Sequence, residues 1–435
     1  MSGWHVAPSG PLVGELAVNG DKSVSHRALL IGALCDGPVE VDNWGDSADT
    51  RATLEAVRAL GVRVDDHGHG RLTVHGVGLD GLRPSVAPVD VRNAGTLMRL
   101  LTGICAMQSR GTYVLDGDAS IRTRPMERVA VPLRAMGAEV ETTDGTPPVT
   151  VVAGTPLRGI EHVMEVSSAQ VKSAILLAGL RADGPTTVVE GTPTRDHTER
   201  MLRAAGAQVQ SRGGRVVLDP PARLSLQRIE VPGDISSAAF PIVAATLIPE
   251  SRIFLRGIGM GAGRTGLLDV LERMGGRIAV FNRRTTDAGE PVADLEVAHA
   301  DLTASSIRAD EVPSLVDELP ILALAACCAR GKTRVRGAGE LRVKESDRLQ
   351  SVRDALWRIG GHIEVEQDGW FIRGVPARLR GGAVDPHGDH RIAMLGAIAG
   401  LYSEEGVTIA DPGAIDVSFP GFRALIEAAT AVRRP

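Results

Sequence analysis

The sequence VRALGVRV, residues 57–64, shows how the chain is built, because similar versions of it recur. Each version is typical of an amphipathic helix that ends at a glycine in the left-handed conformation and is followed by a strand. A degraded version, IEAATAV, begins at Ile426 and has Thr430 in place of the glycine. The other versions are LRAMGAEV (133–140), LRAAGAQV (202–209), LERMGGRI (271–278) and LWRIGGHI (356–363). A spacing of about seventy residues predicts six copies of one structural unit.

A second, strongly apolar element lies between successive copies of this motif. Each version begins with polar residues and becomes apolar within a few positions. Because a helix that is apolar nearly all round is expected inside a protein, we predict that these segments are buried beneath the amphipathic helices and the sheets. The six segments are SHRALLIGAL (25–34), NAGTLMRLLTGICA (93–106), SSAQVKSAILLAGL (167–180), DISSAAFPIVAATL (234–247), DELPILALAACC (317–328) and GDHRIAMLGAIAGL (388–401).

The alternation of helices and strands predicts an α/β protein with two lobes. A chain of 435 residues is too long for one ordinary core, and six units divide most simply into three and three. The border is expected near residues 232–234, before the fourth apolar helix, and Gly20 is a second expected crossing point because a strand in GELAVNG (14–20) precedes the first unit. No GxGxxG follows the first strand, which disfavours a dinucleotide-binding fold.

The composition excludes several classes of function. A net charge of -5 and only 3% aromatic residues argue against nucleic-acid binding. The chain shows no signal-peptide pattern and no apolar run long enough to span a membrane, so we expect a soluble cytoplasmic protein without a membrane partner. Its four cysteines lie in or beside apolar runs and are expected to be buried thiols in a reducing compartment: Cys35, Cys105, Cys327 and Cys328.

The polar starts of the apolar helices are the first candidate binding positions. A helix start exposes unpaired N–H groups and the positive end of the helix dipole, so it attracts anions, although Ser, Asn and Asp are also ordinary capping residues there. Capping alone does not explain the cations that lie at or near element ends, but such residues could still be ordinary surface cations. These cations are Lys22, Arg27, Arg124, Lys172, Lys344, Arg348 and Arg391.

The segment NGDKSVSHRALL, residues 19–30, resembles a phosphate-binding loop only superficially. A Walker A loop has glycine directly before its lysine, whereas Asp21 precedes Lys22 here. What is left is the pair Lys22 and Ser23 at a helix start, with Arg27 one turn later on the same face. This pattern predicts a site for a carboxylate or a phosphate.

Two acidic residues are candidates for proton transfer. If a helix begins near Ser346, Lys344 and Arg348 lie one turn apart with Glu345 beside them. Glu345 then either forms ion pairs or, if it is buried, transfers protons. Asp317 precedes the most apolar helix, where it either caps the helix or accepts a proton from a bound hydroxyl.

Metal and hydrolase chemistry have little support in the sequence. DPHGDHR brings His387 and His390 near two aspartates, but no second histidine or cysteine group with conventional metal-ligand spacing accompanies them. No GxSxG motif is present, which disfavours a serine hydrolase. We expect neither a metal nor a cofactor.

Eight motifs in order along the chain resemble the 5-enolpyruvylshikimate-3-phosphate synthase family of enolpyruvyl transferases. The resemblance implies two lobes, each of three βαβαββ repeats with buried helices and outer sheets, an inside-out α/β barrel. It implies one lobe from residues 21–234 and another from 1–20 and 235–435, with the active site in the cleft between them. The motifs are NGDKSVSHRALL, RNAGTLMRLLTG, DGDASIRTRPMERV, SSAQVKSAILLAGL, TRDHTERML, VPGDISSAAFPIVAA, LRVKESDRL and GDHRIAM.

The resemblance also implies a reaction. The enolpyruvyl group of phosphoenolpyruvate would pass to the 5-hydroxyl of shikimate 3-phosphate through a tetrahedral intermediate, with release of inorganic phosphate, in aromatic amino acid biosynthesis. The matched proton-transfer residues are Asp317, Glu345 and Lys22. The residues matched to shikimate 3-phosphate binding are Lys22, Ser23, Arg27, Ser167, Ser168, Gln170, Asp317 and Lys344. Those matched to phosphoenolpyruvate binding are Lys22, Asn93, Gly95, Thr96, Arg124, Gln170, Arg348 and Arg391. We expect a monomer whose partners are these two small-molecule substrates.

Three positions bear on differences within the family. Val417 stands where relatives often have lysine, so one phosphoenolpyruvate cation is absent or replaced, and His197 stands where some members have tyrosine. Gly95 is retained, which predicts sensitivity to glyphosate. One alternative is a UDP-N-acetylglucosamine enolpyruvyl transferase, although the loop DASIRTRP (118–125) lacks the cysteine typical of that family. The other alternative is a two-lobed anion-binding protein without enzymatic activity.

Overall fold

The computed structural model describes residues 3–431 and divides into two compact units. Of these residues, lobe A comprises 20–232 and 285–290, and lobe B comprises 3–19, 233–284 and 291–431. The short segment 285–290 connects two strands of lobe B, yet it groups with lobe A, an assignment that the sequence did not suggest.

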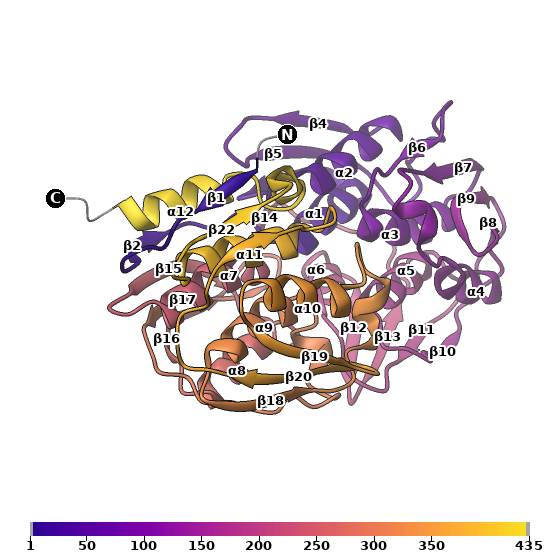
Figure 1. The fold of residues 1–435 in the computed structure, drawn as a ribbon. Helices are drawn as coiled ribbons and strands as arrows, with labels where there is room; N and C mark the ends of the chain where they lie inside the picture. Colours follow the sequence, from indigo (N-terminus) through magenta and orange to yellow (C-terminus); the bar gives the residue numbers. More distant parts are fainter. Residues whose placement is uncertain (1–2, 432–435) are drawn as a thin grey trace. The chain divides into compact units, whose positions relative to one another are not determined.

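Lobe A contains three successive repeats of helix, strand, helix and strand pair (Figure 1). The first repeat consists of α1 (Lys22–Leu34), β3 (Asp36–Asp42), α2 (Ala48–Ala59), β4 (Arg63–Asp66) and β5 (Leu72–Val77). The second consists of β6 (Val89–Asp90), α3 (Gly95–Ala106), β7 (Gly111–Asp116), η1 (Ile121–Thr123), α4 (Glu127–Ala135), β8 (Glu139–Thr143) and β9 (Thr146–Ala153). The third consists of β10 (Glu161–Val163), α5 (Ala169–Gly179), β11 (Thr186–Val189), α6 (His197–Ala204), β12 (Gln208–Arg212) and β13 (Arg215–Asp219), and β14 (Arg228–Glu230) follows it.

Lobe B repeats the pattern with more variation. Its N-terminal strands are β1 (Trp4–Val6) and β2 (Val13–Leu16). The fourth repeat consists of α7 (Ile235–Leu247), β15 (Arg252–Gly259), α8 (Gly266–Arg273), β16 (Arg277–Thr285) and β17 (Pro291–Ala298). The fifth consists of η2 (Val312–Ser314), α9 (Leu319–Cys328), β18 (Gly331–Val335), η3 (Gly339–Val343), α10 (Arg348–Arg358), β19 (His362–Glu366) and β20 (Gly369–Gly374). The sixth consists of β21 (Gly382–Val384), α11 (His390–Leu401), β22 (Val407–Ile409), η4 (Pro412–Val417) and α12 (Phe422–Ala431).

The sheets show how segments far apart in the sequence complete the repeats. In lobe A, β6 pairs in parallel with β7 and β10 with β11, while β14, from the end of the lobe, completes the first repeat by pairing with β3. In lobe B, the N-terminal strand β2 pairs in parallel with β15. The fifth repeat has only a three-stranded sheet, in the order β18-β20-β19.

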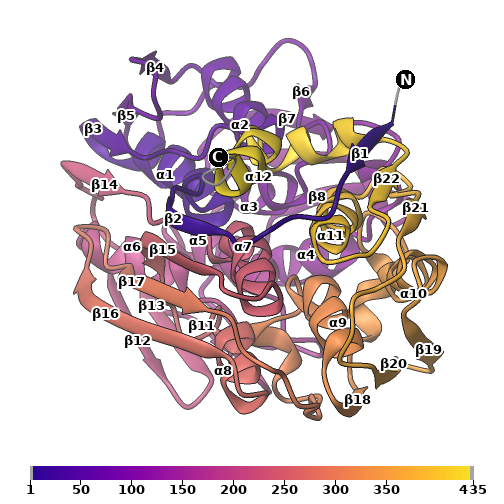
Figure 2. The same cartoon turned by 60° about the vertical axis from the view of Figure 1, so that its left-hand side comes forward.

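The apolar helices are buried, as their composition predicts. Every residue of α9 is buried, and so are all residues of α1 from Val24 onward. In lobe B, α7, α9 and α11 contact one another, and Figure 2 shows them side by side. The polar starts of these helices are consequently held on a rigid apolar scaffold.

The recurring glycines have the conformation that the repeat predicts. Gly61, Gly137, Gly206, Gly275 and Gly360 have φ values of 90°, 100°, 95°, 94° and 100°, and all five lie between an amphipathic helix and the strand that follows it. A side chain is strained in this region, so glycine is the suitable residue. The sixth copy differs because Thr430 lies within α12.

Candidate active site

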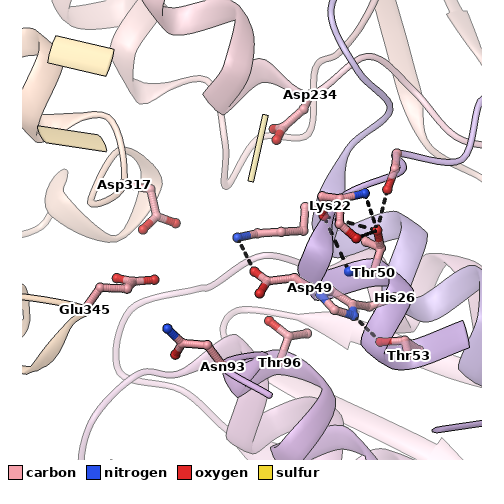
Figure 3. Close-up of polar contacts among 12 residues, drawn as sticks. Lys22, His26, Asp49, Thr50, Thr53, Asn93, Thr96, Asp234, Asp317 and Glu345 are labelled. Carbon is pink, nitrogen blue, oxygen red and sulfur yellow. Dashed lines mark hydrogen bonds and ion pairs between the residues drawn. The ribbon is translucent and has the colours of Figure 1, made fainter. Parts of the chain in front are cut away.

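The first group of candidate residues in lobe A is at the start of α1. Asp21 caps this helix by accepting a hydrogen bond from the backbone N–H of Val24 (2.9 Å). The ammonium group of Lys22 forms an ion pair with Asp49 at 2.8 Å, as Figure 3 shows. Because the side chains of Lys22 and Asp49 are 23% and 12% exposed, a ligand can reach this pair.

Arg27 lies one turn further along α1 and is held by neutral oxygen atoms. Its Nε donates to Thr198 Oγ1 (2.7 Å), its Nη1 to the carbonyl of Ser23 (2.9 Å) and its Nη2 to Ser173 Oγ (2.9 Å). The two hydroxyls are themselves 2.7 Å apart. A guanidinium group has five N–H donors, so these bonds orient it and leave two donors for an anion.

The guanidinium of Arg27 remains charged at neutral pH despite its burial. Burial lowers its pKa to about 10, with Glu199 among the carboxylates that oppose this shift. The neighbouring His26 behaves differently, since burial lowers its pKa to about 3 and it hydrogen-bonds Thr53 at 2.6 Å. His26 is therefore neutral near pH 7, and Arg27 supplies the positive charge.

The start of α3 brings a second set of candidate residues together. Arg124 Nη2 donates to Asn93 Oδ1 (2.8 Å), and Gln170 Nε2 donates to Thr96 Oγ1 (2.9 Å). Arg99 also donates to the side-chain oxygen of Gln170. Four predicted residues thus form two hydrogen-bonded pairs at the N-terminal end of α3, whose N-cap residue makes no side-chain hydrogen bond to the helix.

Gly95 is the first residue of α3 and lies close to Arg124. A Cβ atom at this position would be 2.7 Å from Arg124 Nη1. Such a contact is too short for a carbon, so a side chain at residue 95 would displace the guanidinium group. The glycine is therefore required for the observed position of Arg124.

Ser167 and Ser168 precede α5, and both of their hydroxyl oxygens accept backbone hydrogen bonds. Ser168 Oγ is the N-cap and accepts from Val171 N–H (3.5 Å), while Ser167 Oγ accepts from Thr192 N–H (3.1 Å). An accepting serine still has its own O–H to donate. Both serines can consequently donate to an anionic ligand.

In lobe B, the candidate residues surround Arg348, the first residue of α10. Its guanidinium is 1% exposed and lies among three carboxylates: Asp389 (Nε to Oδ2, 2.8 Å), Glu345 (Nη2 to Oε2, 2.6 Å) and Asp317 (Nη1 to Oδ1, 3.5 Å). Burial tends to lower the pKa of Arg348, but the carboxylates, led by Asp389, raise it above the ordinary value. Arg348 therefore keeps its positive charge, and the three carboxylates around it neutralise that charge.

Asp389 is the most buried of these carboxylates and has two structural roles. It caps α11 by accepting from Arg391 N–H (3.0 Å), and it also accepts from Ser346 Oγ (3.0 Å). Burial would raise its pKa, but Arg348 outweighs burial and the pKa is lowered. Asp389 thus holds Arg348 in place as a permanent anion.

Asp317 and Glu345 are more accessible than Asp389. Their side chains are 17% and 22% exposed. Figure 3 shows both carboxylate groups extending away from the chain segments that carry them. Arg391 Nη1 donates to the backbone carbonyl of Asp317 (2.7 Å), which fixes the segment before α9. Lobe B therefore presents two oriented carboxylates that are in contact with one buried arginine.

Comparison with known proteins identifies the family. The profile of the EPSP synthase (3-phosphoshikimate 1-carboxyvinyltransferase) family matches residues 6–425. The chain belongs to this family. A 3-phosphoshikimate 1-carboxyvinyltransferase of Methylococcus capsulatus is 48% identical over 420 residues, covering 96% of this chain and 95% of the relative. One of Gloeobacter violaceus is 49% identical over 421 residues, covering 96% and 97%. The solved EPSP synthase of Acinetobacter baumannii is 41% identical with a TM-score of 0.89, covering 99% and 98%.

Membership of the EPSP synthase family confirms the predicted fold class and the resemblance drawn from the motifs. The match extends along nearly the whole chain, which favours the main interpretation over a nucleotide-sugar transferase or a non-enzymatic binding protein.

Three expectations from the sequence require correction. Lys172 is not available at an element end, because its side chain is 1% exposed and its ammonium lies 2.8 Å from both Glu190 and Glu199. Lys344 does not share a helix with Arg348, since it has extended backbone and Asp347 caps α10 by accepting from two backbone N–H groups. The residue at the N-cap of α9 is Glu318, so Asp317 precedes the cap.

Sequence reasoning missed several residues of these groups. Asp49 is in the first turn of α2, where an acidic residue is also expected from the helix dipole alone. Arg99, Ser173 and Thr198 contact the candidate residues from buried positions. Asp389 lies in the polar start of the segment GDHRIAMLGAIAGL, and its contact with Arg348 is not evident from the sequence. Their positions could have been suspected from the repeat, but their contacts depend on tertiary packing.

Further features agree with a protein built on an apolar interior. Burial raises the pKa of Cys35 and Cys327 to about 12, and these thiols, like Cys105 and Cys328, are free and buried.

Within residues 3–431, no cluster of three or more His, Cys, Asp or Glu residues is arranged to bind a metal ion. None of the helices described here has the length and apolar character needed to cross a membrane.

Proposed function

We propose that the protein is a 3-phosphoshikimate 1-carboxyvinyltransferase, which transfers the enolpyruvyl group of phosphoenolpyruvate to the 5-hydroxyl of shikimate 3-phosphate. The observation that carries this function is the full-length match to enzymes of that name at about 48% identity. The reaction yields the enolpyruvyl ether and inorganic phosphate and serves aromatic amino acid biosynthesis.

The residues of lobe A are proposed to bind the anionic groups of both substrates. Arg27, with two N–H donors left, suits the shikimate carboxylate together with Ser23. Ser167 and Ser168 suit the phosphate of shikimate 3-phosphate, because their hydroxyls remain able to donate. Gln170 is assigned to both substrates.

Phosphoenolpyruvate is proposed to bind to cations and to the start of α3. Arg124 and Lys22 supply positive charge, while Asn93, Gly95 and Thr96 bring amide and hydroxyl donors. The assignment of Arg391 and Lys344 to substrate binding follows from their motifs.

The carboxylates of Asp317 and Glu345 are proposed to transfer the protons of the reaction. As the 5-hydroxyl attacks C2 of phosphoenolpyruvate, its proton passes to a base and C3 gains a proton from an acid. The tetrahedral intermediate then loses a C3 proton and phosphate, which restores the double bond. Lys22 participates in the proton transfer and stabilises developing charge.

Arg348 has a different proposed role from the one that its motif alone implied. Its guanidinium is buried and shared by Asp317, Glu345 and Asp389. It therefore orients the two proton-transfer carboxylates, and any contact with phosphoenolpyruvate is additional to that role.

The test is release of inorganic phosphate from phosphoenolpyruvate in the presence of EDTA. We expect release with shikimate 3-phosphate as the acceptor and none with UDP-N-acetylglucosamine. Release with the nucleotide sugar alone would overturn the assignment, and no release with either acceptor would leave only a binding protein.

We propose further that the enzyme acts as a monomer in the cytoplasm. The four reduced, buried thiols are consistent with a reducing compartment. Sedimentation velocity should give a single species of about 46 kDa, and cell fractionation should recover the protein with soluble markers. A larger species at micromolar concentration would contradict the monomer.

A further inference from the structure

Each of the three repeats of lobe A has an arginine that donates a hydrogen bond to the backbone of an edge strand. In each, the arginine follows the first residue of the recurring motif and donates to the carbonyl of the motif's last residue. Each acceptor lies in the outermost strand of its sheet, β4, β8 or β12. The bonds are Arg58 to Val64, Arg134 to Val140 and Arg203 to Val209, each 2.7 Å long.

The fifth repeat lacks this arginine. In LWRIGGHI the corresponding position holds Trp357, and the corresponding strand residue is Ile363. Trp357 is 61% exposed, and β19 is the outermost strand of the sheet. An indole group cannot donate to the strand as a guanidinium does, so the backbone edge of β19 is not covered in the same way. The fourth repeat has Glu272 at this position.

A groove of about 810 Å³ lies along this edge. Figure 1 shows β19 between α10 and β20. One wall is a single face of α10, formed by Gln350, Arg353 and Trp357 at a spacing of three and four residues. The other wall consists of residues 362–365, four consecutive residues of β19. A wall made of consecutive edge-strand residues is the geometry to which an extended chain can add a strand.

Two neighbouring cations give this groove positive charge. Lys332, Arg373 and His362 are direct neighbours across β18, β20 and β19, so their side chains share a face of the sheet. Among residues 3–431, the ammonium of Lys332 and the guanidinium of Arg373 make no hydrogen bond or ion pair. Like charges directly opposite each other are destabilising. The lining also contains Glu364 and Arg353, and Arg353 is paired with Asp354 at 2.5 Å, so the unpaired cations of the groove are Lys332 and Arg373.

Several strand cations elsewhere in the protein are paired with carboxylates, including Arg215, which pairs with Glu161 and lies opposite Arg212. In the first repeat Arg63 pairs with Asp65, and in the fourth Arg252 pairs with Glu296. Neither Lys332 nor Arg373 has such a carboxylate partner among residues 3–431, and an acidic ligand would relieve their repulsion.

We propose that this groove binds an extended acidic peptide segment of another protein, which adds a strand to β19. Main-chain hydrogen bonds to the free edge of β19 provide the affinity. Because side chains of a strand alternate, every second residue of the peptide faces α10 and packs against Trp357, while the residues between them face Arg373. The preferred sequence consequently alternates apolar and acidic residues.

The charges of the groove argue against a second copy of the chain as the occupant. Pairing two β19 edges would bring two cationic rows together, and like charges oppose such an interface. A concentration-dependent dimer that is abolished by Trp357→Arg would contradict the proposal.

The direct test uses the hexapeptide acetyl-Glu-Val-Glu-Val-Glu-Val-amide and the full-length protein. Trp357 is a suitable reporter because the other tryptophans, Trp4, Trp44 and Trp370, are buried. We expect a saturable change in tryptophan fluorescence and slower hydrogen exchange of the β19 amides. No saturable binding at millimolar peptide would overturn the proposal.

Two controls separate strand addition from simple charge attraction. N-methylation of the peptide amides that face β19 leaves its side chains unchanged, and we expect binding at least tenfold weaker by calorimetry. A peptide with lysine in place of glutamate should not bind. Equal binding of the N-methylated peptide would overturn strand addition.

The variant Trp357→Arg introduces the arginine found in the first three repeats. It should weaken peptide binding at least tenfold, whereas Trp357→Phe, which keeps an aromatic wall, should bind within threefold of the original protein. Both variants should keep the phosphate-release activity, which shows that they are folded. Unchanged peptide affinity in Trp357→Arg would overturn the proposal.

Discussion

The two lobes hold their central arginines in opposite ways. In lobe A, Arg27 is held by two hydroxyls and a backbone carbonyl, so its positive charge is not cancelled by its immediate hydrogen-bond partners. In lobe B, Arg348 is surrounded by Asp317, Glu345 and Asp389, so its charge is neutralised. An arginine held by neutral oxygens can bind an anion, whereas an arginine among carboxylates orients them. The contrast suggests that lobe A residues bind substrates and lobe B carboxylates transfer protons.

The largest expected effect comes from removing a lobe B carboxylate. Glu345→Gln keeps the shape of the side chain but removes its ability to exchange a proton, so kcat should fall by about 10²- to 10⁴-fold. KM for shikimate 3-phosphate should change much less. Steady-state phosphate release measures both values.

Glu404→Gln is the matched control, because Glu404 is an exposed lobe B residue outside this group. Its activity should equal that of the original enzyme. If Glu345→Gln retained more than a tenth of the original kcat, the role of Glu345 in proton transfer would be refuted.

Lys172 is a cation of lobe A whose contacts indicate a role in stability. Lys172→Met leaves Glu190 and Glu199 buried without their shared positive partner, and loss of one member of a buried ion pair costs about 3–5 kcal/mol. Thermal unfolding should show a clearly lower Tm. An unchanged Tm together with a raised KM would instead make Lys172 a substrate-binding residue.

Arg27→Lys sharpens the claim that lobe A residues bind anions. Lysine keeps the charge but cannot reproduce the fork held by Ser173 and Thr198. KM for shikimate 3-phosphate should rise about tenfold or more, as expected for loss of a charged hydrogen bond, with a smaller change in kcat. Arg228→Lys, an exposed lobe A arginine, is the control. A fall in kcat at unchanged KM would contradict the assignment.

Gly95→Ala should produce the smallest effect. The new methyl group must displace the guanidinium of Arg124 from its position 2.7 Å away. KM for phosphoenolpyruvate should rise several-fold, while KM for shikimate 3-phosphate stays the same. Inhibition by glyphosate is expected for the original chain, and the alanine variant should be less sensitive. If Gly95→Ala and the original chain had equal KM values for phosphoenolpyruvate, Arg124 would be shown to move without weakening substrate binding.

Local sequence patterns predicted the repeated elements well. Glycine at the end of each amphipathic helix and the all-round apolar character of segments such as α9 depend on neighbouring residues alone, so they can be read from the sequence. The crossing of β14 to β3 involves residues far apart in the sequence, and periodicity does not reveal it.

Site residues at the starts of helices could be predicted from the sequence. Site contacts that depend on tertiary packing could not. Lys22 and Arg391 lie in the first turns of buried helices and Arg27 lies one turn further along, so motif and position agree. Lys172 also lies in a helix of this kind, yet its side chain turns inward to two buried carboxylates. Which way a long cationic side chain turns depends on tertiary partners that local sequence does not specify.

Calorimetric titration of shikimate 3-phosphate into the Glu345→Gln and Arg27→Lys variants tests the division of roles most directly. The account predicts that Glu345→Gln binds within threefold of the original affinity although its turnover is nearly lost, and that Arg27→Lys binds at least tenfold more weakly. Equal loss of affinity in both variants would contradict it.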